Sequence, residues 1–213
     1  MESTPNRQTR KRLATRRKIS DVATRLFFER GFNAVTMDEI AEAADVSRMT
    51  VFNHFSRKED LFFDLDEEGR EDLLDALQKK APETPPVEAL RLFAHWAVAN
   101  QRSYVRFFEA NSDKFLATLQ ASEALKARAR AIQDELTDTL TVAIAKSVDR
   151  PLPDPVASLA ASLLVATWSV ALIEAHRAFQ QDHDVTRANI AFLELIDRGT
   201  KGVQSAVDGT PYV

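Results

Sequence analysis

The stretch TMDEIAEAADVSRMTVFNHF, which runs from Thr36 to Phe55, decides the fold of the first part of the chain. Thr36 and Glu39 have the T-x-x-E spacing of a capping box, in which a hydroxyl and a carboxylate each accept a backbone N–H where a helix begins. Asp45 tolerates a left-handed backbone and Ser47 is a favourable N-cap, so these residues predict a turn. The stretch therefore predicts two short helices joined by a three-residue turn.

The second of these helices, Arg48 to His54, turns Val51 and Phe55 toward the interior. Its outward face then carries Arg48, Met49, Thr50, Asn53 and His54. Such a helix suits the major groove of DNA, with its N-terminal residues against the base edges. We expect base contacts from Arg48, Met49 and Thr50, because arginine can pair with guanine and the other two can meet a thymine methyl or a neighbouring base. The alternative for Arg48 is an ordinary solvated side chain.

Helices are also expected on both sides of this stretch. One buried helical stripe has its spacing at Ile19, Val22, Ala23, Leu26 and Phe27. Gly31 is suited to end that helix in a left-handed conformation. A second capping box, Ser56 with Glu59, predicts a longer helix that continues through Leu61, Phe62 and Leu65.

From about Arg17 to Leu65 the chain resembles the tetracycline-repressor (TetR) family of bacterial transcription regulators. The resemblance rests on a basic arm, a helix ending in ERGF, and the pattern T-x-x-x-I-A-x-x-A-x-V-S-x-x-T-x-F-x-H-F-x-x-K-E-x-L. It implies an all-helical, cytoplasmic homodimer with a three-helix DNA-binding domain and a larger C-terminal domain that binds a small effector and dimerises. Beyond about residue 80 only length and helical pattern agree with the family.

Carried over by position, the resemblance implies DNA phosphate contacts from Thr36, Ser47, Phe52, Asn53, His54 and Lys58. Such contacts fix the register of a protein on DNA and do not read its sequence. Phe52 stands where the family usually has a tyrosine whose hydroxyl reaches a phosphate, so that hydrogen bond is absent here. Asp45 stands where glycine is frequent, which leaves the turn intact but slightly strained.

The composition limits the class of protein. A chain of 213 residues can bury a core, either as one domain or as a small domain and a larger one. The absence of cysteine excludes a thiol nucleophile, a thiolate zinc site and a disulfide, and it fits the cytoplasm. The N-terminus is polar and basic with no apolar segment behind it, so we expect no signal peptide.

Charge is distributed unevenly along the chain. The net charge is −4, yet residues 1–60 hold 12 Lys and Arg against 9 Asp and Glu. Seven basic residues lie between Arg7 and Lys18 with no acidic residue among them. Such a run can follow a phosphate backbone or enter a minor groove, and the alternative is a solvated, disordered tail.

Prolines divide the rest of the chain. Breaks are expected at Pro82, Pro85 and Pro86 and again at Pro151, Pro153 and Pro155, with two or three helices between them at roughly 87–119 and 121–147. No strand-like alternation and no internal repeat is present, which predicts an all-α fold. The expected parts are a basic N-terminal arm at 1–16, a helix-turn-helix domain at 17–60 and, by the resemblance, a helical ligand-binding and dimerisation domain at 61–213.

Residues 156–173 contain no charge, which raises the question of a membrane span. The stretch is short for a span, contains several hydroxyl side chains, and is flanked by Asp154 and Glu174 where basic anchors would be expected. We therefore predict a buried helix and no membrane partner.

This helix is apolar on two faces, and both must be covered. The last helix, from about Val185, repeats the spacing, so two helices from each subunit could form a four-helix dimer interface. The predicted interface residues are Leu159, Leu163, Val170, Ile173, Leu193, Ile196 and Val203. The alternative is that these stripes only close the core of the monomer.

The middle helices mix large aromatic side chains with a few polar ones, a composition that suits a mainly apolar pocket. The candidate lining residues are His95, Trp96, Asn100, Tyr104, Phe107, Phe108, Asn111, Phe115, Trp168 and His176. We expect a largely apolar small-molecule effector there, and the alternative is that these residues are simply core.

Catalysis has no support in the sequence. Neither a nucleophile elbow nor a glycine-rich phosphate loop is present, and Glu174, His176, Asp182 and His183 match no metal-site spacing. We expect no metal and no cofactor. The function expected is a DNA-binding regulator that represses from a palindromic operator and is released by its effector. The alternatives are a constitutive DNA-associated helical protein without an effector and a helical enzyme.

Overall fold

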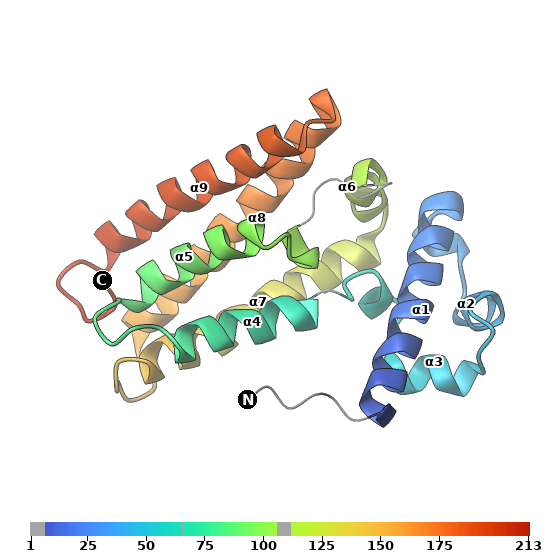
Figure 1. The fold of residues 1–213 in the computed structure, drawn as a ribbon, viewed down its shortest axis with the longest axis horizontal. Coiled ribbons are helices and arrows are strands. Elements are labelled where there is room, and N and C mark those ends of the chain that lie inside the picture. The colour runs from blue at the N-terminus through green and yellow to red at the C-terminus, as the bar shows by residue number, and fades with distance from the viewer. Residues whose placement is uncertain (1–6, 65, 106–111) are drawn as a thin grey trace. The chain divides into compact units, whose positions relative to one another are not determined.

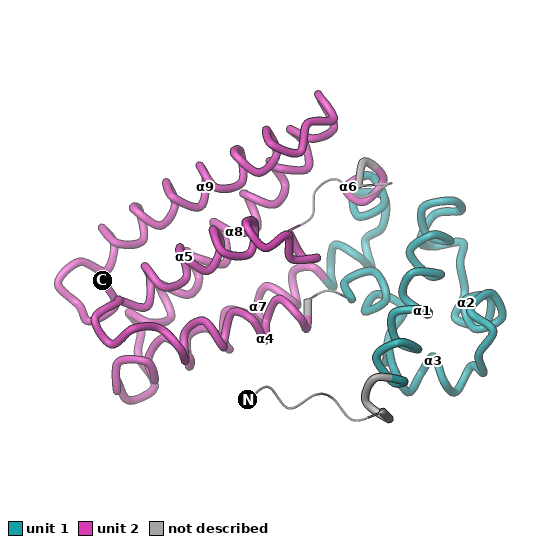
Figure 2. Tube along the Cα trace, viewed as in Figure 1, with its two compact units in different colours: residues 1–64, 117–128 teal, residues 65–116, 129–213 magenta. Residues whose placement is uncertain are grey.

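A computed structural model describes residues 7–64, 66–105 and 112–213, and in these ranges the chain is helical and contains no strand (Figure 1). The predicted all-α fold is confirmed. The chain divides into two compact units (Figure 2). The first contains residues 1–64 and 117–128, and the second contains residues 65–116 and 129–213.

The first unit is built on the helix α1, Arg7–Arg30. It is followed by the 3₁₀ turn η1 (Phe32–Ala34), the helices α2 (Met37–Ala43) and α3 (Arg48–His54), and the 3₁₀ turn η2 (Glu59–Leu61). The stripe predicted on α1 faces the core, since Ile19, Ala23 and Phe27 are fully buried. Gly31 follows α1 with φ of +84°, a conformation that glycine adopts without strain.

The prediction of a longer helix that begins at Ser56 is wrong. From Ser56 to Asp64, the described part of this segment, the structure has only η2, and the next described helix begins at Asp66. Ser56 does not form the second capping box, because its hydroxyl donates to the carboxylate of Asp60 at 3.1 Å. Phe62 is 6% exposed and its ring lies near those of Phe27 and Phe32. Burial of this ring, and not the local capping signal, sets the path of the chain.

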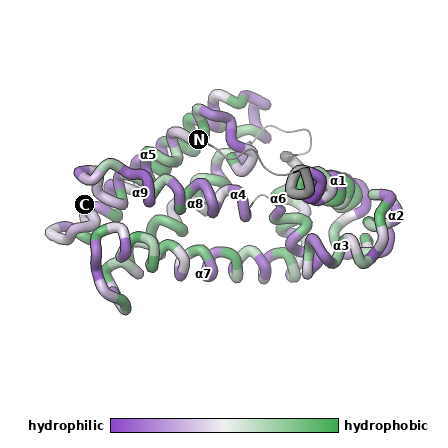
Figure 3. Tube along the Cα trace, turned by 60° about the horizontal axis from the view of Figure 1, so that its bottom comes forward, coloured by the Kyte–Doolittle hydropathy of each residue, from purple (hydrophilic) through white to green (hydrophobic). Residues whose placement is uncertain are grey.

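Six helices and one 3₁₀ turn account for the described residues from 66 onward. They are α4 (Asp66–Gln78), α5 (Pro86–Ala99), η3 (Ser103–Val105), α6 (Ser112–Ala121), α7 (Glu123–Lys146), α8 (Pro155–Asp182) and α9 (Val185–Ala206). The breaks fall at the proline clusters, as predicted. Figure 3 shows hydrophobic and hydrophilic residues interleaved along α7, as expected for a helix with one buried and one exposed face.

The helices α8 and α9 lie side by side (Figure 1). A Cβ built on Gly199 of α9 would overlap the side chain of Thr167 on α8, so glycine permits this close approach. By length and composition alone α8 could cross a membrane, with a mean hydropathy of 2.1 over its most apolar window, of which 28% is buried. Mostly buried core helices of soluble proteins pass the same test, but α8 is only partly buried in the single chain, so the predicted buried helix is not confirmed.

The predicted dimer residues divide into two groups. On α8, Leu159, Val170 and Ile173 are 45%, 57% and 38% exposed, while Leu163 and, on α9, Leu193 are half-buried. Ile196 and Val203 are only 4% and 2% exposed and pack in the hydrophobic core of their own chain. Their assignment to an interface is wrong, because the face of α9 that carries them is already covered within the monomer.

Candidate DNA-binding site

The start of α2 is fixed by the predicted capping box. The Glu39 N–H donates to the Thr36 hydroxyl at 3.3 Å, and the Thr36 N–H donates to the Glu39 carboxylate at 2.8 Å. Arg30 donates to the same carboxylate at 2.5 Å. This hydrogen bond from Arg30, with those from Thr36, lowers the pKa of Glu39 to about 2. The end of α1 and the start of α2 are thus tied together.

The turn between α2 and α3 has the predicted geometry. Asp45 adopts φ of +52°, and the hydroxyl of Ser47 accepts the Thr50 N–H at 3.0 Å as the N-cap of α3. Val51 and Phe55 are buried. One face of α3 is thereby held against the unit, and the opposite face is directed to solvent.

The exposed face of α3 carries the predicted base-reading residues. Arg48 and Met49 are exposed, the latter by 68% of its surface, and Thr50 is half-buried with its hydroxyl 2.8 Å from that of Ser47. Asn53 is exposed and His54 is half-buried. Arg48 and Met49 are therefore accessible to a groove, whereas Thr50 is partly engaged in the cap.

Two side chains lie close to Arg48, and no sequence motif indicates this role for either of them. Its Nη1 lies 3.1 Å from Oδ2 of Asp38, in the first turn of α2. Its guanidinium carbon lies 5.4 Å from the centre of the Phe52 ring, one turn further along α3. Asp38 and Arg48 are ten residues apart on different helices, and such a separation gives no periodic signal in the sequence. Arg48 and Phe52 are four residues apart on one helix, and this spacing does indicate that two side chains are neighbours.

Several predicted phosphate-binding groups are already engaged within the chain. The Thr36 hydroxyl donates to Glu39, and that of Ser47 caps α3. The Lys58 ammonium donates to the carbonyls of Phe32 and Val35, each at 2.9 Å, and partial burial lowers its pKa. Lys58 thus links η1 to the segment after α3, and a phosphate contact from it stays a prediction.

Burial also lowers the pKa of His54, with Arg12 and Arg16 as further causes, which favours a neutral ring. The Arg16 guanidinium donates to the carbonyl of His54 at 2.8 Å and lies 4.3 Å from the centre of the Phe55 ring. Residues 7–16, predicted as an arm, form the first part of α1. Within that part Arg16 ties α1 to α3, and the exposed Lys11 and Arg12 remain available to a phosphate backbone.

Most of the predicted effector-pocket residues lie in the second unit. The Phe93 ring stacks on Tyr104 and Trp168 with centroids 6.2 and 5.6 Å away, and Trp168 meets Phe192 edge-on. Tyr104 donates to Asp72 at 2.8 Å, and burial followed by this bond raises its pKa.

The remaining candidates have varied surroundings. Trp96 is 44% exposed, Asn100 donates to the carbonyl of Trp96, and Phe115 stacks on His176. Phe107, Phe108 and Asn111 lie outside the described residues. The aromatic rings that the structure does describe pack on one another, so the effector pocket stays a prediction.

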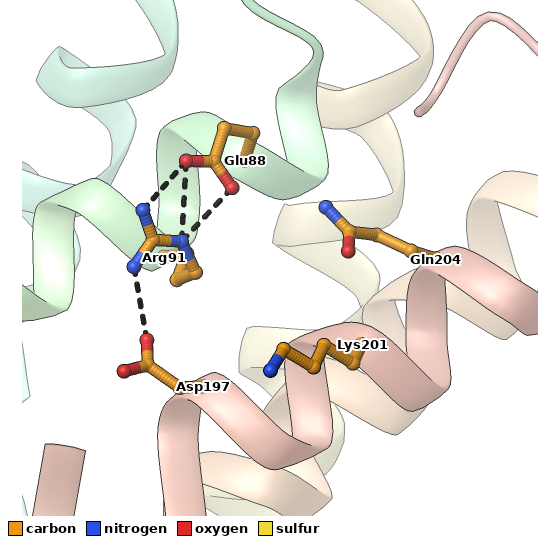
Figure 4. A pocket seen from close by; sticks show the side chains of 5 residues that line it. All are labelled: Glu88, Arg91, Asp197, Lys201 and Gln204. Atoms are coloured by element: carbon orange, nitrogen blue, oxygen red, sulfur yellow. Dashed lines mark hydrogen bonds and ion pairs between the residues drawn. The ribbon is translucent and has the colours of Figure 1, made fainter. Parts of the chain in front are cut away.

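A pocket of about 340 Å³ lies between α5 and α9 (Figure 4). Arg91 donates to Glu88 and, at 2.9 Å, to Asp197, while Lys201 and Gln204 face them from α9. Asp197 also lies 2.8 Å from His95. The pocket contains none of the predicted lining residues, and its charges suit a polar guest instead of the apolar one expected.

The described residues define a class of protein by their fold: an N-terminal helix-turn-helix, α2–turn–α3, with the helices α4 to α9 after it. Residues 19–65 match the family model described as "Bacterial regulatory proteins, tetR family". The match covers the N-terminal part of the chain, which is therefore similar to the DNA-binding domain of this family.

Curated transcription regulators match a short part of the chain. Over 51 residues the chain is 45% identical to the HTH-type transcriptional regulator AcrR of Shigella flexneri, and the match covers 24% of each protein. Over 58 residues it is 41% identical to the HTH-type transcriptional repressor Rv1474c of Mycobacterium tuberculosis, covering 27% of this chain and 31% of that protein. The sequence match thus spans less than a third of these curated relatives.

The structural likeness extends further than the sequence match. The structure titled "SmeT-Triclosan complex" superposes with a TM-score of 0.56 at 19% identity and covers 94% of this chain and 95% of that one. At this identity the likeness establishes a shared fold, which includes the C-terminal domain.

Proposed function

We propose that the protein is a transcriptional repressor that binds a palindromic operator as a homodimer and leaves it when a small molecule binds the C-terminal domain. The observation that carries the proposal is the capped α2–turn–α3 unit, which directs Arg48 and Met49 to solvent while Val51 and Phe55 anchor α3. A helix held by one face and polar at its exposed N-terminus is suited to the major groove.

The exposed apolar side chains of α8 support the homodimer. Leu159, Val170 and Ile173 recur along one helix, each more than a third exposed in the single chain. A two-fold symmetric operator needs a two-fold symmetric protein, and a second copy of α8 would cover this face.

Repression is tested by transcription in vitro from a promoter that carries the preferred binding sequence. Increasing protein should lower the amount of transcript, and a promoter with the sequence scrambled should be unaffected. More transcript would indicate an activator, and no change on a promoter that the protein occupies would contradict a regulatory role.

The effector is tested by a thermal-shift screen of small molecules, followed by operator titration with each hit. Linkage requires that an inducer weaken operator binding by the same factor by which operator DNA weakens inducer binding. Hits that stabilise the protein without changing operator affinity would favour a constitutive DNA-binding protein.

A further inference from the structure

We propose that Asp38 and Phe52 position Arg48 for base recognition, so that sequence preference depends on two side chains besides the one that meets the base. This inference rests on the proposed DNA-binding function. Asp38 holds one terminal nitrogen of the guanidinium at 3.1 Å, and the Phe52 ring lies 5.4 Å from the guanidinium carbon. The side chain is therefore restrained from two directions, by a carboxylate from α2 and by an aromatic face from α3.

The restraint leaves part of the guanidinium available. The Asp38 carboxylate takes Nη1, and among the described residues no hydrogen-bond partner is present for Nε or Nη2 of Arg48. Two N–H groups on one edge of a planar guanidinium match the paired acceptors O6 and N7 of guanine. The arginine can therefore keep its contact with Asp38 while it reads a base.

The ion pair contributes little to folding. Arg48 and Asp38 are 64% and 62% exposed, and exposed pairs of this kind have small effects on stability. Its effect lies in binding, because an arginine with many rotamers loses entropy when it is fixed on a base. Restraint before binding removes part of that loss, but only for the base pair that Arg48 contacts.

Asp38 also places a negative charge near the DNA phosphates, which opposes binding to any sequence. Its removal should therefore have two effects of opposite sign. Binding to random DNA should become tighter, whereas the preference for the base pair read by Arg48 should decrease.

The test uses the full chain and duplexes in which each position of its preferred sequence is changed to all four base pairs, with affinities measured by fluorescence anisotropy at one salt concentration. Asp38→Asn should lower the preference at one base pair of each half-site by about three- to ten-fold. The matched control is Glu42→Gln, which removes the same charge from an exposed position on α2, whereas the ion pair of Arg48 is formed with Asp38. It should leave the preference unchanged.

Phe52 gives an independent arm of the experiment. Phe52→Leu removes the aromatic face and should lower the preference at the same base pair, whereas Phe52→Tyr keeps the ring and should preserve it. In an Arg48→Ala background, Asp38→Asn should have no further effect on the preference.

Three results would overturn the inference. The first is an unchanged preference in both Asp38→Asn and Phe52→Leu. The second is an equal loss from Asp38→Asn with and without Arg48, which would make Asp38 a direct base contact. The third is an unmodified protein without any sequence preference, which would overturn the proposed function and this inference with it.

Discussion

Arg48 lies at the exposed N-terminus of α3, and its substitution should have the clearest effect on base recognition. Arg48→Ala should cost about 1 to 3 kcal/mol on the preferred sequence and relax the choice of one base pair. Asn53→Ala, at a predicted phosphate contact, should instead weaken all sequences to a similar extent. Anisotropy titrations against preferred and random duplexes separate the two, and an equal loss on both duplexes for Arg48→Ala would show that it reads no base.

We expect Lys58 to contribute to the stability of the fold. Lys58→Ala leaves the carbonyls of Phe32 and Val35 without their shared donor, and we expect the free energy of unfolding to decrease by about 1 to 2 kcal/mol. Urea denaturation measures this, with the exposed neighbour Arg57→Ala as the control. Unchanged stability together with a weaker salt dependence of DNA binding would assign Lys58 to a phosphate.

Local residue signals were predictable where they involve neighbours in the chain. The capping box at Thr36 and the positive φ at Asp45 and Gly31 follow from side chains a few residues apart. The contact of Asp38 with Arg48 was not predictable, because it depends on the angle at which α3 leaves the turn.

Among the helices, the close packing of α8 on α9 depends on Gly199. Gly199→Ala should destabilise the C-terminal domain by about 1 to 3 kcal/mol, because its methyl group would overlap Thr167. Gly202→Ala on the same helix meets nothing within 4 Å and should stabilise it by about 0.5 to 1 kcal/mol. The melting temperature should decrease for Gly199→Ala and increase for Gly202→Ala. An increase for both variants would contradict this packing.

We expect the stability of the fold to depend on pH through the side chains at the N-terminus of α8. The Asp154 carboxylate accepts the Tyr212 hydroxyl at 2.7 Å and the N–H groups of Val156 and Ala157. The bond from Tyr212, followed by those from the backbone, lowers the pKa of Asp154 to about 2, and burial raises the pKa of Tyr212 to about 12.

A carboxyl with a lowered pKa stabilises the fold above its ordinary pKa and loses that effect as the pH falls toward 2. A phenol with a raised pKa loses its effect as the pH rises from 10 toward 12. Tyr212→Phe should therefore lower the melting temperature most between about pH 5 and 9, with a difference that narrows at both extremes. A difference that is as large at pH 3 as at pH 7 would exclude the link to Asp154.

The boundaries of helices were predictable where the sequence has a strong break or cap. The prediction failed where burial in the tertiary structure competes with the local signal. The proline clusters located the starts of α5 and α8. Ser56 and Glu59 had the capping pattern, yet burial of Leu61 and Phe62 limits that segment to a 3₁₀ turn. Periodicity showed that α9 has an apolar stripe but not what covers it, so Ile196 and Val203 were assigned to a partner instead of to the core.

For the whole molecule, the exposed side chains of α8 predict the oligomeric state. Val170→Glu places a charge in the proposed interface, where it would be desolvated without a partner, and should yield monomers that no longer bind a two-fold site. Val142→Glu on α7 is the matched control, since Val142 is 48% exposed against 57% for Val170. Sedimentation should show a dimer for the control, and a dimer for both variants would place the interface elsewhere.

The most direct test of the DNA-binding function is selection of preferred duplexes from a random library by the unmodified protein, followed by the stoichiometry of the selected complex. We expect a palindrome whose half-sites are about one helical turn, or a multiple of it, apart, bound by two chains or a multiple of two. Recovery of no common sequence, with equal affinity for every duplex, would contradict a regulator that reads an operator.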